Sequence, residues 1–237
     1  MNGFPVLPVP EFEADAPVMM LTASSAYDKD IIGKLEKYIT DGGKAVVTSG
    51  FVKETLGKGI ERITSIRDRG RTMTARDFAS ENSFFYNRWE RESSVKPVTV
   101  PILEFRNNAT WGAVCKAISE EDACTLFALD TYGKGQMYTL VVPEVFSDIK
   151  YYPEAVLDRM RREFAVNGIR LSGKGQISVF AYDNDVFVIY PYVDNNTFDS
   201  DITVFIKDAK SIVPFDSEKE ILPLYSENGE AAFRLRA

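Results

Sequence analysis

The stretch VMMLTASSAYDKDIIGKLEKYITDGGKAVVTSG, residues 18–50, places a helical pattern between two short apolar runs. The runs are residues 17–21 and 44–50, and each is typical of a buried strand. The glycine pair 42–43 ends the helix, because helices commonly stop at a left-handed glycine. Strand, helix and strand in this order predict a βαβ unit with parallel strands and a right-handed crossover. The helix, expected over 28–41, has its apolar residues on one face: Ile31, Ile32, Leu35 and Ile39.

The middle of the chain carries weaker signals. Apolar runs at 124–129 and 136–142 flank a turn that contains two glycines, which predicts a β-hairpin. Residues 98–105 are typical of a strand. By contrast, the many polar and aromatic residues of 77–97 indicate a loop, and we expect a short helix over 110–118.

The last third of the chain changes character. An amphipathic helix is expected over 153–164, with Pro153 at its start, where a missing N–H is harmless. Runs at 176–182 and 186–192 then alternate around a turn, which predicts a second hairpin. Short strands at close spacing indicate a small antiparallel sandwich. Further strands are expected at 202–207, 220–224 and 231–235.

Together these patterns predict an α/β fold with two domains. A flavodoxin-like, largely parallel sheet flanked by helices is expected over 1–170, and a small antiparallel β-sandwich over 171–237. The boundary is placed near 168–173, where the helical pattern stops and glycines cluster.

Composition and charge exclude several function classes. The chain has 237 residues, of which 45% are hydrophobic and 27% charged, as in ordinary globular proteins. A net charge of −7 argues against a general nucleic-acid binder. The sequence contains no histidine, which rules out Ser-His-Asp and Cys-His triads and any histidine-bound zinc. No cofactor is indicated.

The two cysteines, Cys115 and Cys124, are too few for a disulfide framework or a four-cysteine metal site. One disulfide between them and two buried thiols both fit the sequence, and we expect buried thiols. No metal site is predicted. No apolar run reaches the roughly 18 residues that a membrane-spanning helix needs. The first residues lack the pattern of a signal peptide, and the compartment stays open.

An aromatic segment in the expected loop is the first candidate site. It contains Phe84, Phe85, Tyr86, Arg88 and Trp89. Aromatic side chains with neighbouring charges suit a protein interface, because Trp, Tyr and Arg dominate binding hot spots. They also suit the face of a sugar ring, or a loop that packs on its own domain. These three alternatives stay open.

A second candidate lies where the two parallel strands are expected to end. Open α/β sheets usually bind ligands at the carboxyl ends of their strands. Small polar residues there line a pocket or cap the following helices, and we favour capping. The residues are Thr22, Ser24, Ser25, Ser49 and Gly50.

Three other patterns carry weaker functional signals. Arginines crowd between residues 62 and 76, which fits an anion site or a solvated, self-neutralised surface. Gly-Lys-Gly occurs at 57–59, 133–135 and 173–175, and each lacks the spacing of a phosphate-binding loop. Glycoside hydrolysis needs two carboxylates across a cleft, and the candidates are Glu90, Glu92 and Glu104.

Several stretches together resemble a class I glutamine amidotransferase-like domain. They are residues 18–26, the helix that ends at Asp41-Gly42-Gly43, residues 44–50, and the hairpin turn 132–135. The resemblance is to the non-catalytic version found in β-galactosidase trimerisation domains and in bacterial glycoside-hydrolase-like proteins. It covers residues 1–168, and a small β-sandwich often follows in such proteins.

The chain also departs from that family. Active relatives keep a nucleophilic Cys and a His, so the absence of histidine argues strongly against amidotransferase activity. The first strand and helix are not evident before Pro17, so either the chain begins inside the fold or residues 1–16 take an irregular path.

The resemblance implies a non-catalytic accessory module that serves oligomerisation, domain packing or glycan contact. Its partners would be other domains, a second copy or a glycan, without nucleic acid or membrane. The alternatives are a glycan hydrolase with a carboxylate pair and a binder of small molecules or anions at the strand ends.

Overall fold

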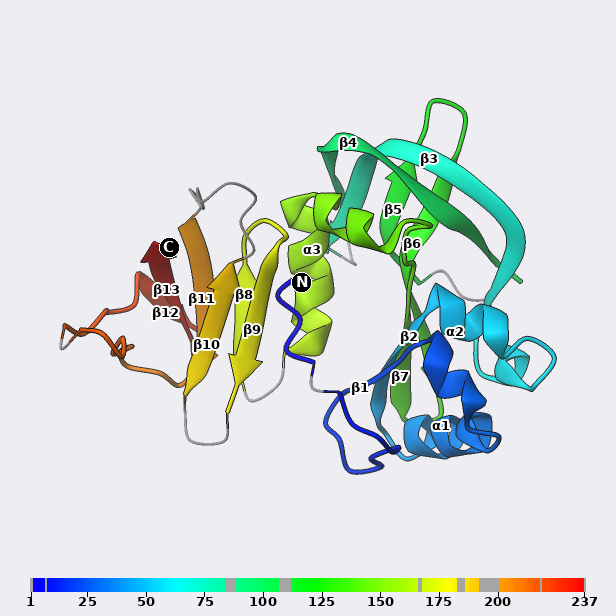
Figure 1. Ribbon diagram of the computed structural model, residues 1–237, viewed down its shortest axis with the longest axis horizontal. Coiled ribbons are helices and arrows are strands. Elements are labelled where there is room, and N and C mark those ends of the chain that lie inside the picture. The colour runs from blue at the N-terminus through cyan, green and yellow to red at the C-terminus, as the bar shows by residue number, and fades with distance from the viewer. Residues whose placement is uncertain are drawn as a thin grey trace. The chain divides into compact units, whose positions relative to one another are not determined.

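The computed structural model describes residues 2–6, 8–83, 88–106, 112–165, 168–182, 186–191, 201–217 and 219–236 (Figure 1). Its contacts divide the chain into two compact units. The larger unit is Pro8–Tyr151, and the smaller unit combines Met1–Leu7 with Tyr152–Ala237. The division into domains 1–170 and 171–237 stays a prediction.

The larger unit is built on one seven-stranded sheet, in the order β1-β2-β7-β6-β4-β3-β5. Strand β6 also pairs with β5, so β4, β3, β5 and β6 form a closed β-barrel. The strands are β1 (Met19–Leu21), β2 (Lys44–Thr48), β3 (Ile66–Ser83), β4 (Arg88–Phe105), β5 (Ala113–Ile118), β6 (Ala123–Tyr132) and β7 (Gly135–Leu140).

The predicted flavodoxin-like, largely parallel sheet is wrong. In the described part of this sheet, β1–β2 and β2–β7 pair in parallel, and the other strand pairs are antiparallel. The prediction failed because two segments that were expected to be a loop and a helix form strands of the barrel. Antiparallel neighbours need only a turn between them, whereas parallel neighbours need a crossover connection.

The βαβ unit itself is confirmed. Helix α1 (Ile31–Thr40) connects β1 to its parallel neighbour β2. Its buried face contributes Leu35 and Ile39, both fully buried, to an apolar cluster with residues of β1, β2 and β7. Short helices surround this unit at η1 (Ala23–Tyr27), α2 (Ser49–Glu54) and η2 (Ile60–Arg62), and η3 (Phe146–Tyr151) ends the larger unit.

Strands β3 and β4 replace the loop expected over 77–97. They pair in antiparallel fashion along almost their whole length, with register shifts that mark bulges. Apolar residues such as Phe78, Val98 and Val100 are fully buried, while the intervening charged residues lie mostly on the solvated face. An antiparallel sheet can expose one face to water, so a polar-rich sequence still forms strands here. Ala113–Ile118, within the segment 110–118 that was expected to be a short helix, form strand β5, and residues 110 and 111 lie outside the described residues.

The smaller unit contains two antiparallel sheets and helix α3 (Glu154–Arg161), which continues into η4 (Arg162–Phe164). The expected helix over 153–164 and the second hairpin are confirmed. One sheet has the order β12-β13-β11-β8 and the other pairs β10 with β9. The strands are β8 (Ile169–Ser172), β9 (Ile177–Ala181), β10 (Phe187–Pro191), β11 (Asp201–Lys207), β12 (Tyr225–Glu227) and β13 (Glu230–Arg236).

The two sheets share an apolar cluster that includes Leu171, Ile177, Val179, Ile202 and Val204. The sandwich architecture as such stays a prediction. The strand expected over 220–224 is wrong, because in this segment Ile221 makes a single isolated bridge to Ile212.

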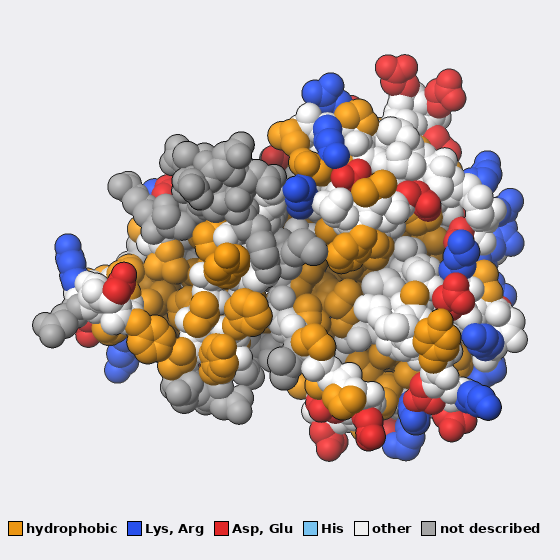
Figure 2. Space-filling view, in the orientation of Figure 1, with side chains coloured by type: hydrophobic (Ala, Val, Ile, Leu, Met, Phe, Trp, Pro, Cys, Tyr) orange, Lys and Arg blue, Asp and Glu red, His pale blue; other side chains and the backbone are white. Residues whose placement is uncertain are grey.

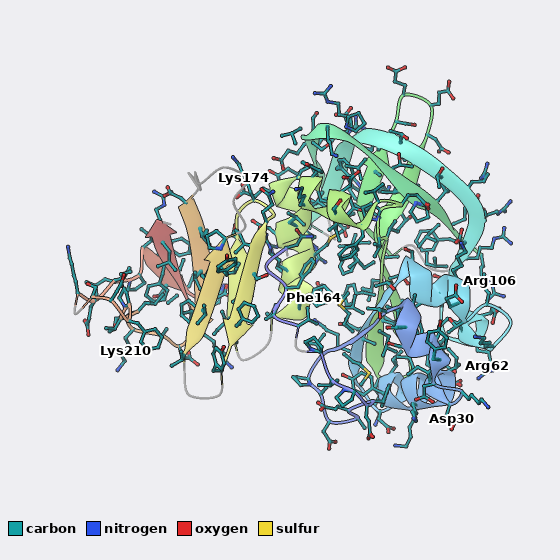
Figure 3. All side chains as sticks on the ribbon, in the orientation of Figure 1. Asp30, Arg62, Arg106, Phe164, Lys174 and Lys210 are labelled. Atoms are coloured by element: carbon teal, nitrogen blue, oxygen red, sulfur yellow. The ribbon has the colours of Figure 1, made fainter. Side chains whose placement is uncertain are left out.

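The N-terminal segment belongs to the smaller unit through a buried arginine. The Arg161 side chain is fully buried, and it donates to the backbone carbonyls of Asn2, Gly173 and Lys174. Phe4 packs on Phe164 with ring centroids 4.5 Å apart. Figure 3 labels Phe164 and Lys174, which belong to the segments on either side of β8.

Candidate functional site

The structure describes only part of the aromatic candidate. Phe84, Phe85 and Tyr86 lie outside the described residues, as does the side chain of Arg88, whose backbone begins β4. Trp89 is half-buried on β4, and the Lys116 ammonium on β5 lies 4.2 Å from its ring centroid. This cation–π contact holds the Trp89 ring against strand β5 of the same barrel. An interface or glycan role for the segment stays a prediction.

The strand-end candidates do follow the parallel strands. Thr22 comes directly after β1, and its hydroxyl lies 2.8 Å from that of Ser24, while its N–H donates to the Ser25 hydroxyl at 3.2 Å. Ser49 follows β2, is buried, and accepts a hydrogen bond from the Val142 N–H at 3.1 Å. A Cβ at Gly50 would lie 3.2 Å from that of Ala23. These contacts describe local turns and packing, and a ligand pocket there stays a prediction.

The arginine-rich stretch gathers around one carboxylate. Glu104 on β4 forms ion pairs with three arginines of β3: Arg69 at 2.5 Å, Arg71 at 2.9 Å and Arg67 at 3.7 Å. Arg62 pairs instead with Glu36 on α1 at 3.0 Å. The two carboxylates therefore offset two of the four positive charges of these arginines.

One buried carboxylate in the larger unit is held by hydrogen bonds from neighbouring residues. Asp130 on β6 is buried and accepts hydrogen bonds from the Thr64 hydroxyl at 2.8 Å and from the Ser65 N–H at 3.1 Å. Within the described ranges, no group of three or more His, Cys, Asp or Glu residues is arranged to hold a metal ion. No helix in this same part of the chain is long and apolar enough to cross a membrane.

A surface that the sequence analysis missed lies on the smaller unit. We call it the β9–β10 face, and Figure 2 shows hydrophobic side chains gathered over these two strands. Four large apolar residues of this face are each 41–56% exposed, which is high for side chains of this kind. The residues are Phe180 (49%), Tyr182 (54%), Val188 (41%) and Tyr190 (56%).

The strand register explains how this face arises. Phe180 lies directly opposite Val188, so their side chains are neighbours on the same side of the hairpin. Alternate residues such as Ile177 and Val179 point the other way, into the apolar cluster shared by the two sheets. The ribbon is therefore apolar on both faces, although only one face is covered within the described smaller unit.

The smaller unit also exposes apolar residues outside this hairpin. The segment between β11 and β12 exposes Val213, Phe215, Leu222 and Leu224. Among the described residues, most of the exposed large apolar side chains belong to the smaller unit. The signal was present in the sequence, because the outward positions of the hairpin 176–192 carry Phe, Tyr and Val, where a solvated strand would carry polar residues.

Comparison with known proteins gives a structural likeness without a family assignment. No protein-family model matches the chain, and no curated protein matches it. The solved structures similar to it include β-galactosidases. The β-galactosidase from Bacillus circulans sp. alkalophilus is 10% identical with a TM-score of 0.38, over 94% of this chain and 34% of that one.

Two further β-galactosidases give similar values, both at 13% identity over 94% of this chain. A GH42 β-galactosidase from G. stearothermophilus has a TM-score of 0.39 over 32% of its own chain. The cold-adapted β-galactosidase from Rahnella sp. R3 has a TM-score of 0.37 over 34% of its own. The chain thus spans about a third of the length of the β-galactosidases that it resembles in structure.

Proposed function

We propose that this chain is a non-catalytic accessory module of a carbohydrate-active protein, and that its role is self-association. The β9–β10 face carries this proposal. Of the three roles implied by the sequence resemblance, oligomerisation is the one that an exposed apolar face supports. The resemblance to a glutamine amidotransferase-like trimerisation domain stays part of the proposal, and the carbohydrate-active context comes from it.

The physical argument rests on the cost of leaving these side chains in water. Fully burying a Val, Leu or Phe side chain contributes about 1.5–3 kcal/mol. Phe180 and Val188 are each about half exposed, so each retains a sizeable part of that free energy for association. Contiguous exposed apolar patches mark interaction sites in soluble proteins, and aromatic residues are enriched at interface cores.

A second copy of the chain is the occupant that the face favours. The hairpin exposes Phe180 of β9, Tyr182 directly after that strand, and Val188 and Tyr190 of β10. Such mixed aromatic and β-branched surfaces can pack on themselves. Within the described residues, β10 pairs only with β9, so backbone groups at its other edge can extend the sheet across an interface. A symmetric contact of this kind is the commonest form of oligomer.

The experiment is sedimentation equilibrium of the full chain over a wide concentration range. We expect concentration-dependent association of the wild type and loss of that association in the double variant Phe180→Ser/Val188→Ser. The matched control is Tyr27→Ser/Val95→Ser, which removes two exposed apolar side chains from the larger unit. Circular dichroism checks that each variant stays folded. A wild type that stays monomeric throughout would refute self-association, as would equal association of both double variants.

A further inference from the structure

A cavity of about 560 Å³ lies within the smaller unit, on the sheet that contains β8, β11, β12 and β13. We call it the β11 pocket. Its residues come from helix α3, from η4, from all four strands of the sheet and from the turns beside them, so regular elements hold most of them in place. The side chains that carry the argument are Asp158, Arg162, Arg170, Phe205, Lys207 and Tyr225.

One row of neighbouring residues crosses the sheet under this pocket. Arg170 on β8 lies opposite Phe205 on β11, which lies opposite Ala232 on β13, which lies opposite Tyr225 on β12. The small alanine separates the two aromatic residues. The Arg170 guanidinium lies 3.7 Å from the Phe205 ring centroid, whereas the Tyr225 side chain is 53% exposed. Tyr225 therefore offers an accessible ring at the pocket.

Some charges of the pocket are already neutralised by ion pairs. Arg170 pairs with Glu230 at 2.7 Å. The Asp158 carboxylate pairs with Arg161 at 2.7 Å. It also accepts hydrogen bonds from the Gly173 N–H at 3.2 Å and from the Ser172 hydroxyl. These groups form the fixed framework of the pocket.

Two cations that line the pocket are not part of that framework. The side chains of Arg162 and Lys207 have no hydrogen-bond or ion-pair partner among the described residues. Of the acidic lining residues, Glu227 has a carboxylate that likewise has no partner in that part of the chain. The unneutralised side chains therefore leave a net positive charge of one. A guanidinium and an ammonium beside an aromatic ring suit a ligand that has both a negative charge and a ring face.

We propose that the β11 pocket binds an anionic sugar, of the uronic acid class. The C–H face of the pyranose ring packs on Tyr225, and the carboxylate pairs with Arg162 and Lys207. Hydroxyl groups can donate to the free lone pairs of Glu227, and charge-assisted hydrogen bonds of this kind are the stronger ones. This proposal deepens the carbohydrate context of the proposed function, but it uses residues outside the β9–β10 face.

The test is isothermal titration of the full chain with three probes: a galacturonic acid oligosaccharide, a neutral galactose oligosaccharide and inorganic sulfate. We expect the uronate to bind at least about tenfold more tightly than either of the others. Arg162→Gln/Lys207→Gln and Tyr225→Ala should each weaken uronate binding by about tenfold, a change that corresponds to about 1.4 kcal/mol. The control Lys210→Gln/Arg234→Gln removes two cations of the same unit that do not line the pocket.

Three results would overturn the proposal. Absence of uronate binding would do so directly. Sulfate binding as tight as uronate binding and unaffected by Tyr225→Ala would show a general anion patch. Neutral-sugar binding as tight as uronate binding would show that the cations have no role. Because Phe180→Ser/Val188→Ser leaves the pocket residues intact, loss of association in that variant with unchanged uronate binding separates the two proposals.

Discussion

Arg161 and Asn2 are 159 positions apart in the sequence, yet the Arg161 Nε donates to the Asn2 backbone carbonyl at 2.8 Å. The same guanidinium reaches the carbonyls of Gly173 and Lys174 and the Asp158 carboxylate. Burial lowers the Arg161 pKa, although Asp158 opposes this shift. One buried side chain thus joins the N-terminal segment, helix α3 and the turn before β9.

Replacing Arg161 should strongly destabilise the smaller unit. Arg161→Met keeps an unbranched apolar stem but removes the ion-pair partner of Asp158 and the donor to three backbone carbonyl groups. Breaking a buried pair by removing one partner costs about 3–5 kcal/mol. Chemical denaturation monitored by circular dichroism measures this free energy of unfolding.

Arg234 provides the control for that substitution. It pairs with Asp201 at 3.4 Å, and both side chains are about half exposed. Surface ion pairs contribute about 0–1 kcal/mol, so Arg234→Met should change stability little. Equal effects of the two substitutions would show that the buried hydrogen bonds of Arg161 do not stabilise the fold.

Two glycines of the larger unit should respond in opposite directions to alanine. Gly33 is exposed in helix α1, and a Cβ added there would meet no atom within 4 Å, so Gly33→Ala should stabilise by about 0.5–1 kcal/mol. At Gly135 a Cβ would collide with the carbonyl oxygens of Gly43 and Ile39. Gly135→Ala should therefore destabilise by about 1–3 kcal/mol. Thermal unfolding of both variants tests this, and a shift of the same sign in both would contradict it.

The stability of the larger unit should fall in acid partly through Glu36. The Arg62 guanidinium and the Tyr132 hydroxyl both donate to this carboxylate, at 3.0 and 2.9 Å, and they lower its pKa. A carboxyl group with a lowered folded-state pKa stabilises the fold above its ordinary pKa, and this contribution is lost as the pH falls through the folded-state value.

The measurement is the free energy of unfolding between about pH 6 and about pH 3, the window in which carboxylates titrate. Glu36→Gln should flatten part of this pH dependence, whereas Glu54→Gln, at the exposed end of α2, should not. Identical pH profiles for the wild type and Glu36→Gln would exclude a contribution from this carboxylate.

Both cysteine thiols should be unreactive in the folded protein. Cys115 and Cys124 are free and buried, and burial raises the pKa of Cys124 to about 11. The thiolate is the reactive form, so little of it exists at about pH 8. We expect Ellman's reagent to modify no thiol in native buffer and both thiols in denaturant. One fast-reacting thiol in native buffer would contradict the burial of both residues.

The local elements with strong periodic patterns were predicted from the sequence. The unit β1–α1–β2, the hairpin β6–β7, helix α3 and the hairpin β9–β10 all follow from apolar spacing and turn glycines. Such patterns report which face of an element is buried, and neighbours in the sequence are sufficient to specify them.

The barrel could not be predicted in this way. Strands β3 and β4 are rich in charged residues, and β5 is a short apolar segment that is compatible with helix or strand. Their conformation depends on partners elsewhere in the sequence: Asp77 pairs with both Ser93 and Ile118 across the sheet. Strand propensity is set largely by such cross-strand packing, which a single segment does not reveal.

The sequence by itself determined the local elements, the absence of histidine chemistry and the acidic charge. The tertiary structure alone decided that the sheet closes into a barrel, that Phe180 and Val188 stay exposed, and that Arg162, Lys207 and Tyr225 line one pocket. The physical reason is that periodicity gives the direction of a side chain relative to its own element. What covers that side chain depends on strand pairing between residues that are distant in the sequence.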